Sequence, residues 1–182
     1  MTQKLIILDR DGVINEDSDA YIKSPEEFIP IPGSLASIAQ LNQAGFTVVV
    51  ATNQSGIARG YFDLATLRAI HNKLTRLLAK QGAHIDEIFY CPHGPDDNCD
   101  CRKPKTGMLK EIVSKYGMYA ETVISIGDSL RDLQAATALG IKSILVRTGK
   151  GRKTESDLPN HPALAAIPVF DNLSAAVSDI LK

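Results

Sequence analysis

The sequence predicts an α/β fold in which a doubly wound parallel sheet carries helices on both faces. Short apolar runs alternate with segments of helical periodicity, which is the pattern of parallel strands joined by crossover helices. Polar residues that could bind or react with a ligand follow several of these runs. In doubly wound sheets, such residues lie at the carboxyl ends of the strands. No insertion is long enough for a large cap domain, so we expect residues 1–182 to form one domain.

The composition is typical of a soluble globular protein. The 182 residues are 44% hydrophobic and 23% charged, which suffices for one sizeable core. A net charge of −1 without a basic stripe argues against a general polyanion binder, so no nucleic-acid partner is expected. The N-terminus shows no signal-peptide pattern, and no apolar stretch approaches the roughly 20 residues of a membrane span. We therefore expect a cytoplasmic monomer with no membrane partner.

Six apolar runs have the length of buried strands. The clearest begins at Phe46, because a valine-rich run lies there between Gly45 and the polar Thr52-Asn53-Gln54. Strands of this kind, each followed by a helix, imply a Rossmann-like sheet whose ligands bind beyond its carboxyl ends. The expected strands are residues 4–8, 46–51, 85–90, 122–126, 143–146 and 167–170.

Five segments have apolar residues at helical spacing. The longest opens at Asp63, ends at Gly82, and has apolar residues at positions 67, 70, 74, 77 and 78 on one face. Ser34 is the expected N-cap of the first helix and Gly45 its stop. The other expected helices begin at Gly107, Leu130 and Leu173.

Two long segments lack such periodicity. Glu16 to Pro32 is polar and holds three prolines, so we expect a mobile loop over the tip of the first strand. Arg147 to Pro162 is basic and glycine-rich, and we expect it to be a loop as well.

Polar residues at or just after the predicted strand ends suggest a reactive site. Asp9, Thr52, Lys103 and Asp128 supply a nucleophile, a hydroxyl donor, a cation and a second carboxylate, the groups that phosphoryl transfer requires. Singly, the last three are better explained as a cap, a turn or a surface residue. The pair Asp9 and Asp11 is different, because a cap needs only one acid. Together these residues predict a phosphoryl-transfer site.

A compact loop holds all three cysteines with the spacing C-x-H-x5-C-x-C. Three thiolates and one imidazole close a tetrahedral zinc shell without an open position, so this zinc would be structural and would fix the adjacent Lys103. A disulfide or a chance cluster of buried thiols is the weaker reading for reduced cysteines beside a histidine. The candidate zinc ligands are Cys91, His93, Cys99 and Cys101, whereas His71, His84 and His161 are expected to be surface or core residues.

The stretches around these residues resemble the four motifs of the haloacid dehalogenase superfamily of phosphatases. The matching stretches are Asp9-Arg10-Asp11-Gly12, Thr52-Asn53, Lys103-Pro104 and Gly127-Asp128-Ser129-Leu130-Arg131-Asp132. The resemblance implies that Asp9 attacks the phosphorus and that Asp11 is the general acid and then the base. Thr52 and Lys103 would hold the phosphoryl oxygens. Catalytic magnesium would be held by the carboxylates of Asp9 and Asp128 and the carbonyl of Asp11, with Asp132 outside the direct ligand shell.

The zinc loop narrows the resemblance to the branch of the D-glycero-D-manno-heptose 1,7-bisphosphate 7-phosphatases and the histidinol-phosphate phosphatases. Residues 52–61, 101–109 and 145–151 are most similar to the heptose group, although Thr106 replaces a frequent proline and the zinc loop is short. This implies a sugar bisphosphate substrate from the nucleotide-activated heptose pathway of lipopolysaccharide core or related glycans. The expected substrate-binding residues are Asn53, Ser55, Arg59, Arg102 and Lys150.

Three alternatives remain open. A histidinol-phosphate phosphatase shares nearly all the catalytic and zinc residues. A phosphorylated signalling receiver also combines carboxylates, a threonine and a lysine, but its reactive aspartate would follow a middle strand and not the first. A nucleic-acid 3'-phosphatase could use the zinc loop as a binding knuckle, although the near-neutral charge argues against it.

Overall fold

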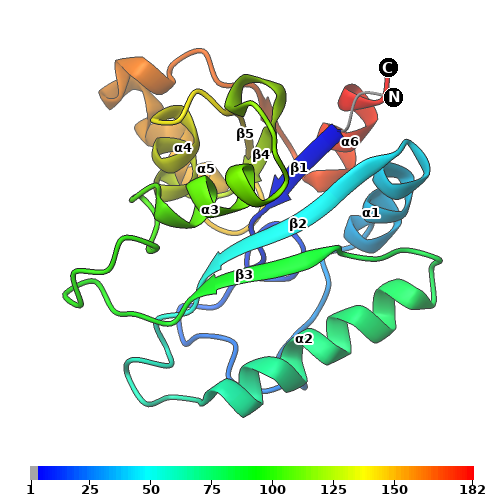
Figure 1. Ribbon diagram of the computed structural model, residues 1–182, viewed down its shortest axis with the longest axis vertical. Helices are drawn as coiled ribbons and strands as arrows, with labels where there is room; N and C mark the ends of the chain where they lie inside the picture. The colour runs from blue at the N-terminus through cyan, green and yellow to red at the C-terminus, as the bar shows by residue number, and fades with distance from the viewer. Residues whose placement is uncertain (1–3) are drawn as a thin grey trace.

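The computed structural model describes residues 4–182 and is built on a parallel sheet of order β3-β2-β1-β4-β5-β6 (Figure 1). The chain moves outward from β1 to β2 and β3, and then returns to β4 on the other side of β1. The predicted doubly wound fold is therefore confirmed, with its switch point beside β1. The strands are β1 (Lys4–Leu8), β2 (Phe46–Asn53), β3 (Glu87–Cys91), β4 (Ile124–Gly127), β5 (Lys142–Val146) and β6 (Val169–Phe170).

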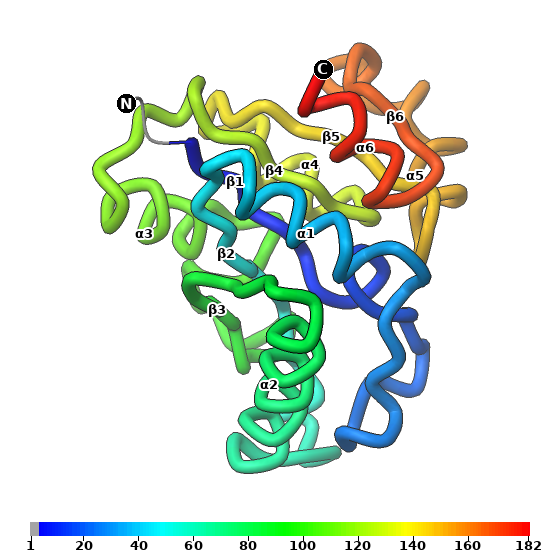
Figure 2. Tube along the Cα trace, turned by 90° about the vertical axis from the view of Figure 1, so that its right-hand side faces the viewer, coloured from blue at the N-terminus to red at the C-terminus, as the bar shows by residue number. Residues whose placement is uncertain are grey.

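Alternate residues of the central strands are buried under helices on both faces. Ile6 of β1 packs in one cluster with residues of α1, α2 and α6, whereas Ile7 packs in another with residues of α3 and α4. Figure 2 shows α1 between α2 and α6 on the first face. The helices are α1 (Ser34–Gln43), α2 (Leu64–Ala79), α3 (Gly107–Lys115), α4 (Leu130–Thr137), α5 (Gly151–Asp157) and α6 (Leu173–Ile180).

Several element boundaries differ from the predictions. Ser34 is not the cap of α1: Gly33 holds that position with φ of 83°, and the Ser34 hydroxyl donates to the carbonyl of Ile14 at 2.7 Å. The strand expected at residues 85–90 begins at Glu87 and continues to Cys91, and the one expected at 122–126 begins at Ile124. The segment 147–162 is not all loop, because it contains α5. Polar residues dominate this helix, and Arg147 stabilises it from outside through two hydrogen bonds to Glu155.

The segment from residue 16 to residue 32 is partly fixed to the body of the protein. The Lys73 ammonium of α2 donates to the carbonyls of Pro25 and Phe28 at 2.6 and 2.8 Å, and Phe28 is fully buried. Its first part, residues 17–22, faces the site described below. The mobility of this segment stays a prediction. Within residues 4–182, no helix has the length and hydropathy needed to cross a bilayer.

Candidate active site

The carboxyl ends of three adjacent strands bring together side chains that are distant in the sequence. Asp9 follows β1, Thr52 lies near the end of β2, and Asp128 follows β4. These residues line a cavity of about 300 Å³ together with Lys103. The structure thus places the four residues singled out in the sequence at one site.

Lys103 is a buried cation between two carboxylates. Its Nζ donates to Oδ1 of Asp132 at 2.6 Å and lies 3.2 Å from Oδ1 of Asp9. Burial opposes this charge, but the charges of Asp132 and Asp9 outweigh burial and raise the pKa of Lys103 above its usual value. A third bond, to the carbonyl of Ala51 at 2.6 Å, fixes the ammonium group in place.

Asp9, Asp128 and Asp132 form a crowded carboxylate cluster whose ligand oxygens lie within 4.8 Å of one another. Burial and the charge of Asp132 raise the pKa of Asp9 to about 7, while burial and the charge of Asp9 raise that of Asp128 to about 9. A divalent cation would relieve this repulsion, and Mg²⁺ binds oxygen ligands. Asp132 is the least available ligand, because Lys103 and Ser129 occupy its two oxygens.

The protein backbone fixes one oxygen of Asp128. Oδ2 accepts a hydrogen bond from the N–H of Lys150 at 2.8 Å, and a Cβ atom at Gly12 or Gly149 would overlap this oxygen. Both glycines have positive φ, at 84° and 56°, which also disfavours a larger residue. No hydrogen bond from residues 4–182 reaches Oδ1 of Asp128 or the carbonyl oxygen of Asp11. These two oxygens and the Asp9 carboxylate therefore fit a magnesium ion.

The carboxylate of Asp11 is held by a network of donors. Arg10 donates to it through Nε and Nη2 at 2.9–3.1 Å, Asn15 through Nδ2 at 2.9 Å, and Gln54 through Nε2 at 3.0 Å. Burial favours the protonated form, but the charge of Arg10 and these hydrogen bonds outweigh it and lower the pKa of Asp11. In the free protein Asp11 is therefore a fixed carboxylate at the cavity wall.

The residues after Thr52 support the site in different ways. Gln54 connects two of the candidate residues, since its amide also donates to Oγ1 of Thr52 at 2.9 Å. The Asn53 side chain bonds both the N–H and the carbonyl of Lys103, at 3.1 and 3.0 Å. Asn53 and Ser55 also line the cavity, as expected of substrate-binding residues.

Basic side chains form the outer part of the cavity. Arg59, Arg102 and Lys150 line it as expected, and so does Arg131, which the sequence reasoning did not single out as a binding residue. Burial and the nearby charges of Arg131 and Arg59 lower the pKa of Arg102, so these two guanidinium groups lie close enough to oppose its charge. No salt bridge within residues 4–182 involves any of these three arginines. We name Arg59, Arg102 and Arg131 the arginine cluster.

The segment after Asn15, which was expected to lie over the tip of the first strand, forms one wall of the cavity. Asp17, Ser18 and Asp19 line the cavity, and Oδ2 of Asp17 lies 3.4 Å from Nζ of Lys150. Tyr21 lines it with φ of 65° and packs against Tyr61, with ring centroids 5.2 Å apart. This segment therefore narrows the cavity without a separate cap domain.

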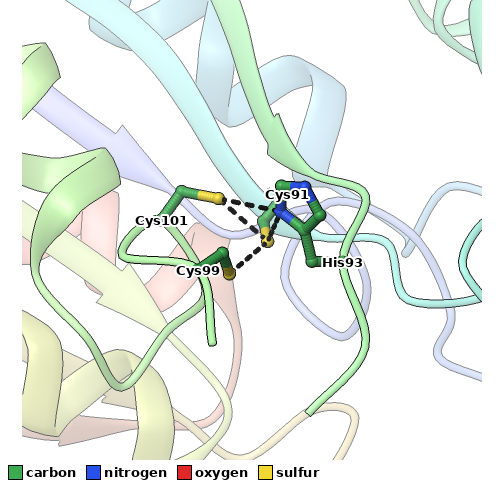
Figure 3. A group of neighbouring side chains, drawn as sticks. All are labelled: Cys91, His93, Cys99 and Cys101. Carbon is green, nitrogen blue, oxygen red and sulfur yellow. Dashed lines mark hydrogen bonds between the residues drawn. The ribbon is translucent and has the colours of Figure 1, made fainter. Parts of the chain in front are cut away.

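The three cysteines and His93 converge at the end of β3 and in the loop that follows it (Figure 3). Sγ of Cys91 lies 3.7 Å from Sγ of Cys99, 3.1 Å from Sγ of Cys101 and 3.6 Å from Nδ1 of His93. A tetrahedral site with Zn–S bonds of about 2.3 Å puts two sulfurs about 3.8 Å apart. Burial, with a hydrogen bond to Cys101, raises the pKa of Cys91 to about 12, so the Cys91 thiol resists ionisation without a cation. The four side chains could hold a metal ion.

Magnesium should stabilise the protein more at high pH than at low pH. Because the pKa values of Asp9 and Asp128 are raised on folding, the metal-free protein loses stability as the pH rises from about 4 toward 9. At high pH, magnesium offsets the repulsion between the ionised carboxylates of Asp9 and Asp128. Below pH 6, magnesium must first displace protons from these carboxylates. We expect the magnesium-induced rise in melting temperature to be larger at pH 9 than at pH 6, and to be nearly lost in Asp128→Asn. Equal increments at the two pH values would contradict this assignment.

Comparison with known proteins places the chain in a class. Residues 4–137 match the family model of the polynucleotide kinase 3 phosphatases, and residues 100–176 match that of HAD-hydrolase-like proteins. With the doubly wound sheet and the Asp9 site, these matches define a phosphatase of the haloacid dehalogenase class.

More similar proteins define the family. The D-glycero-beta-D-manno-heptose-1,7-bisphosphate 7-phosphatase of Pseudomonas putida is 56% identical over 179 residues, which cover 98% of this chain and 99% of the relative. The Pseudomonas aeruginosa enzyme of the same name is 54% identical over the full length of both chains. The crystal structure of the Bordetella bronchiseptica D,D-heptose 1,7-bisphosphate phosphatase with magnesium and phosphate superposes with a TM-score of 0.94 at 55% identity, covering 98% of each chain. The chain belongs to the family of the D-glycero-beta-D-manno-heptose-1,7-bisphosphate 7-phosphatases.

Proposed function

We propose that this chain hydrolyses the 7-phosphate of D-glycero-β-D-manno-heptose 1,7-bisphosphate with the help of magnesium. The observation that carries the proposal is the arginine cluster, which supplies a second anion site on the cavity that holds Asp9. The relatives' names support this substrate, and the product would enter the nucleotide-activated heptose pathway of lipopolysaccharide core or related glycans.

The chemistry follows from the side chains around Asp9. An oxygen of Asp9 attacks phosphorus, and the sugar oxygen leaves with a proton from Asp11. Lys103 and Thr52 bind the phosphoryl oxygens and stabilise their charge. Bound magnesium, held by Asp9, Asp128 and the Asp11 carbonyl, would supply positive charge for the same oxygens.

Asp11 acts as an acid in the first step and as a base in the second. Before the first step, the phosphate dianion of the bound substrate opposes the charge of Arg10, so substrate binding favours the protonated, acidic form of Asp11. After the sugar has left, the ionised Asp11 takes a proton from water, which attacks phosphorus and releases phosphate from Asp9. The fixed position of Asp11 thus serves both steps.

The second phosphate binds the arginine cluster. Loss of one of these arginines should therefore reduce the preference for the bisphosphate more than it reduces the rate of phosphate hydrolysis itself. Charge-assisted hydrogen bonds contribute about 1.5–3 kcal/mol each, so Arg59→Ala, Arg102→Ala or Arg131→Ala should lower kcat/KM for the bisphosphate by roughly ten- to a hundredfold. Activity on heptose 7-phosphate should change much less, and Arg68→Ala on the exposed face of α2 is the matched control. If all three variants keep the wild-type preference for the bisphosphate, the anchor lies elsewhere.

A second candidate function is hydrolysis of a 3'-phosphate on a nucleic acid. One observation favours it, the match of residues 4–137 to the polynucleotide kinase 3 phosphatases. Parallel assays with heptose 1,7-bisphosphate, histidinol phosphate and a 3'-phosphorylated oligonucleotide separate the candidates. We expect the heptose bisphosphate to have the highest kcat/KM. A preference for either of the other substrates would overturn the proposed function.

The cluster of Cys91, His93, Cys99 and Cys101 is proposed to hold a structural zinc ion. Cys101 precedes Arg102 and Lys103 directly, so loss of the metal should loosen both basic residues. We expect about one zinc per chain by the four-ligand rule, with lower zinc content, melting temperature and kcat/KM in Cys101→Ser. Asp96→Ala, an exposed change in the same loop, is the control. A zinc-free protein with full stability and activity would disprove this role.

A further inference from the structure

Arg10 is a buried cation whose donors are divided between two partners. Its side chain is fully inaccessible to solvent. Nε and Nη2 point to the Asp11 carboxylate, whereas Nη1 lies 3.1 Å from Nε2 of His71 in α2. A buried guanidinium group needs acceptors on all its edges, since an unpaired charged donor is costly to bury. Asp11 and His71 satisfy opposite ends of this group.

The chemistry of arginine determines the state of His71. Guanidinium groups only donate hydrogen bonds and stay protonated in proteins, so Nε2 of His71 must accept and its ring must be neutral. Burial and the charge of Arg10 lower the pKa of His71 to about 4, which agrees with this state. A neutral acceptor fixes Arg10 without competing for its charge, as a carboxylate at position 71 would.

We propose that His71 is a positioning residue that holds Arg10, and through it the carboxylate of Asp11, in the orientation required for proton transfer. The contact reaches from α2 to the turn after β1, two elements that are 61 residues apart at this point. His71 itself does not line the cavity around Asp9. It therefore acts on the reaction through Arg10 and Asp11 only.

This inference rests on the proposed function of Asp11 as acid and base, and it predicts a selective kinetic effect. Small displacements of a catalytic group reduce the rate of proton transfer, whereas the groups that bind phosphate stay in place. Removing the acceptor should lower kcat by about ten- to a hundredfold and leave KM and the affinity for inorganic phosphate within about twofold.

Three variants separate positioning from bulk packing. His71→Leu removes the acceptor at similar volume. His71→Gln keeps an amide oxygen three bonds from Cβ, at the reach of Nε2, whereas His71→Asn offers the same amide at a shorter reach. We expect the leucine and asparagine variants to lose kcat and the glutamine variant to retain at least half of it. Should His71→Leu not fold, the glutamine and asparagine pair decides the result.

A double-mutant cycle tests whether the effect passes through Asp11. With glycerol 2-phosphate as the probe, an alkyl phosphate whose alcohol needs a proton to leave, His71→Asn should lower kcat in the wild-type background and have almost no effect in the Asp11→Ala background. Wild-type kcat in both His71→Leu and His71→Asn, no rescue by glutamine, or equal loss in both backgrounds would each overturn the proposal. Because this probe is not a sugar bisphosphate, the test stands even if heptose 1,7-bisphosphate is not the substrate.

Discussion

Asp9→Asn is expected to abolish turnover and leave the fold intact. An amide cannot form the aspartyl-phosphate, so kcat should fall by at least about 10⁴-fold. The amide oxygen can still accept the hydrogen bond that the N–H of Arg10 makes at 2.8 Å. Removing one charge from a cluster in which burial and repulsion raise the pKa of Asp9 should raise the melting temperature of the metal-free protein near pH 8.

Steady-state kinetics and thermal melting test this expectation together. Asp19→Asn is the matched control, because Asp19 lines the same cavity but is exposed. It should keep kcat within about threefold, since exposed carboxylates contribute little. An Asp9→Asn protein with ordinary turnover would show that another group attacks the phosphorus.

Lys103→Met is expected to have the second-largest effect. The change leaves Asp9 and Asp132 without their buried cation, and breaking a buried pair in this way costs about 3 kcal/mol of stability. The phosphoryl oxygens also lose a donor, which should lower kcat by about 10³-fold.

The pH dependence of stability shows why Lys103→Met destabilises the protein. Lys103 and Ser129 hold the pKa of Asp132 below its usual value against the effect of burial. Without Lys103 this pKa should rise, so the variant should lose stability as the pH increases from 5 to 9. The control Lys110→Met, on the exposed face of α3, should melt like the wild type. A uniform decrease at all pH values would indicate lost packing instead of unbalanced carboxylates.

The sequence was sufficient to predict the fold class and the residues at the strand ends. Local patterns carry this information: an apolar run followed by Asp9 and Asp11 needs no knowledge of distant segments. The bounds of β1 and the start of α2 at Asp63, which is its N-cap, were predicted correctly for the same reason. The segment α5 was missed because its sequence is polar and its support comes from Arg147, outside the helix.

Contacts between distant segments were not predictable from local patterns. Asp132 and Lys103 are 29 residues apart, and nothing near either residue indicates that they form a 2.6 Å pair. His71 appeared to be an ordinary core or surface histidine, since its partner Arg10 lies on another element. Arg131 stands in a recognised motif, but its place in the arginine cluster depends on how α4 meets the loops that carry Arg59 and Arg102.

The most direct test of the account is ³¹P NMR of heptose 1,7-bisphosphate during hydrolysis by the magnesium-loaded protein. The arrangement of Asp9 and the arginine cluster on one cavity predicts that one phosphate reacts while the other is held. The resonance of the 7-phosphate should disappear as inorganic phosphate forms, and the 1-phosphate resonance should persist at full intensity. Release of the 1-phosphate, or of both phosphates at equal rates, would contradict the central claim.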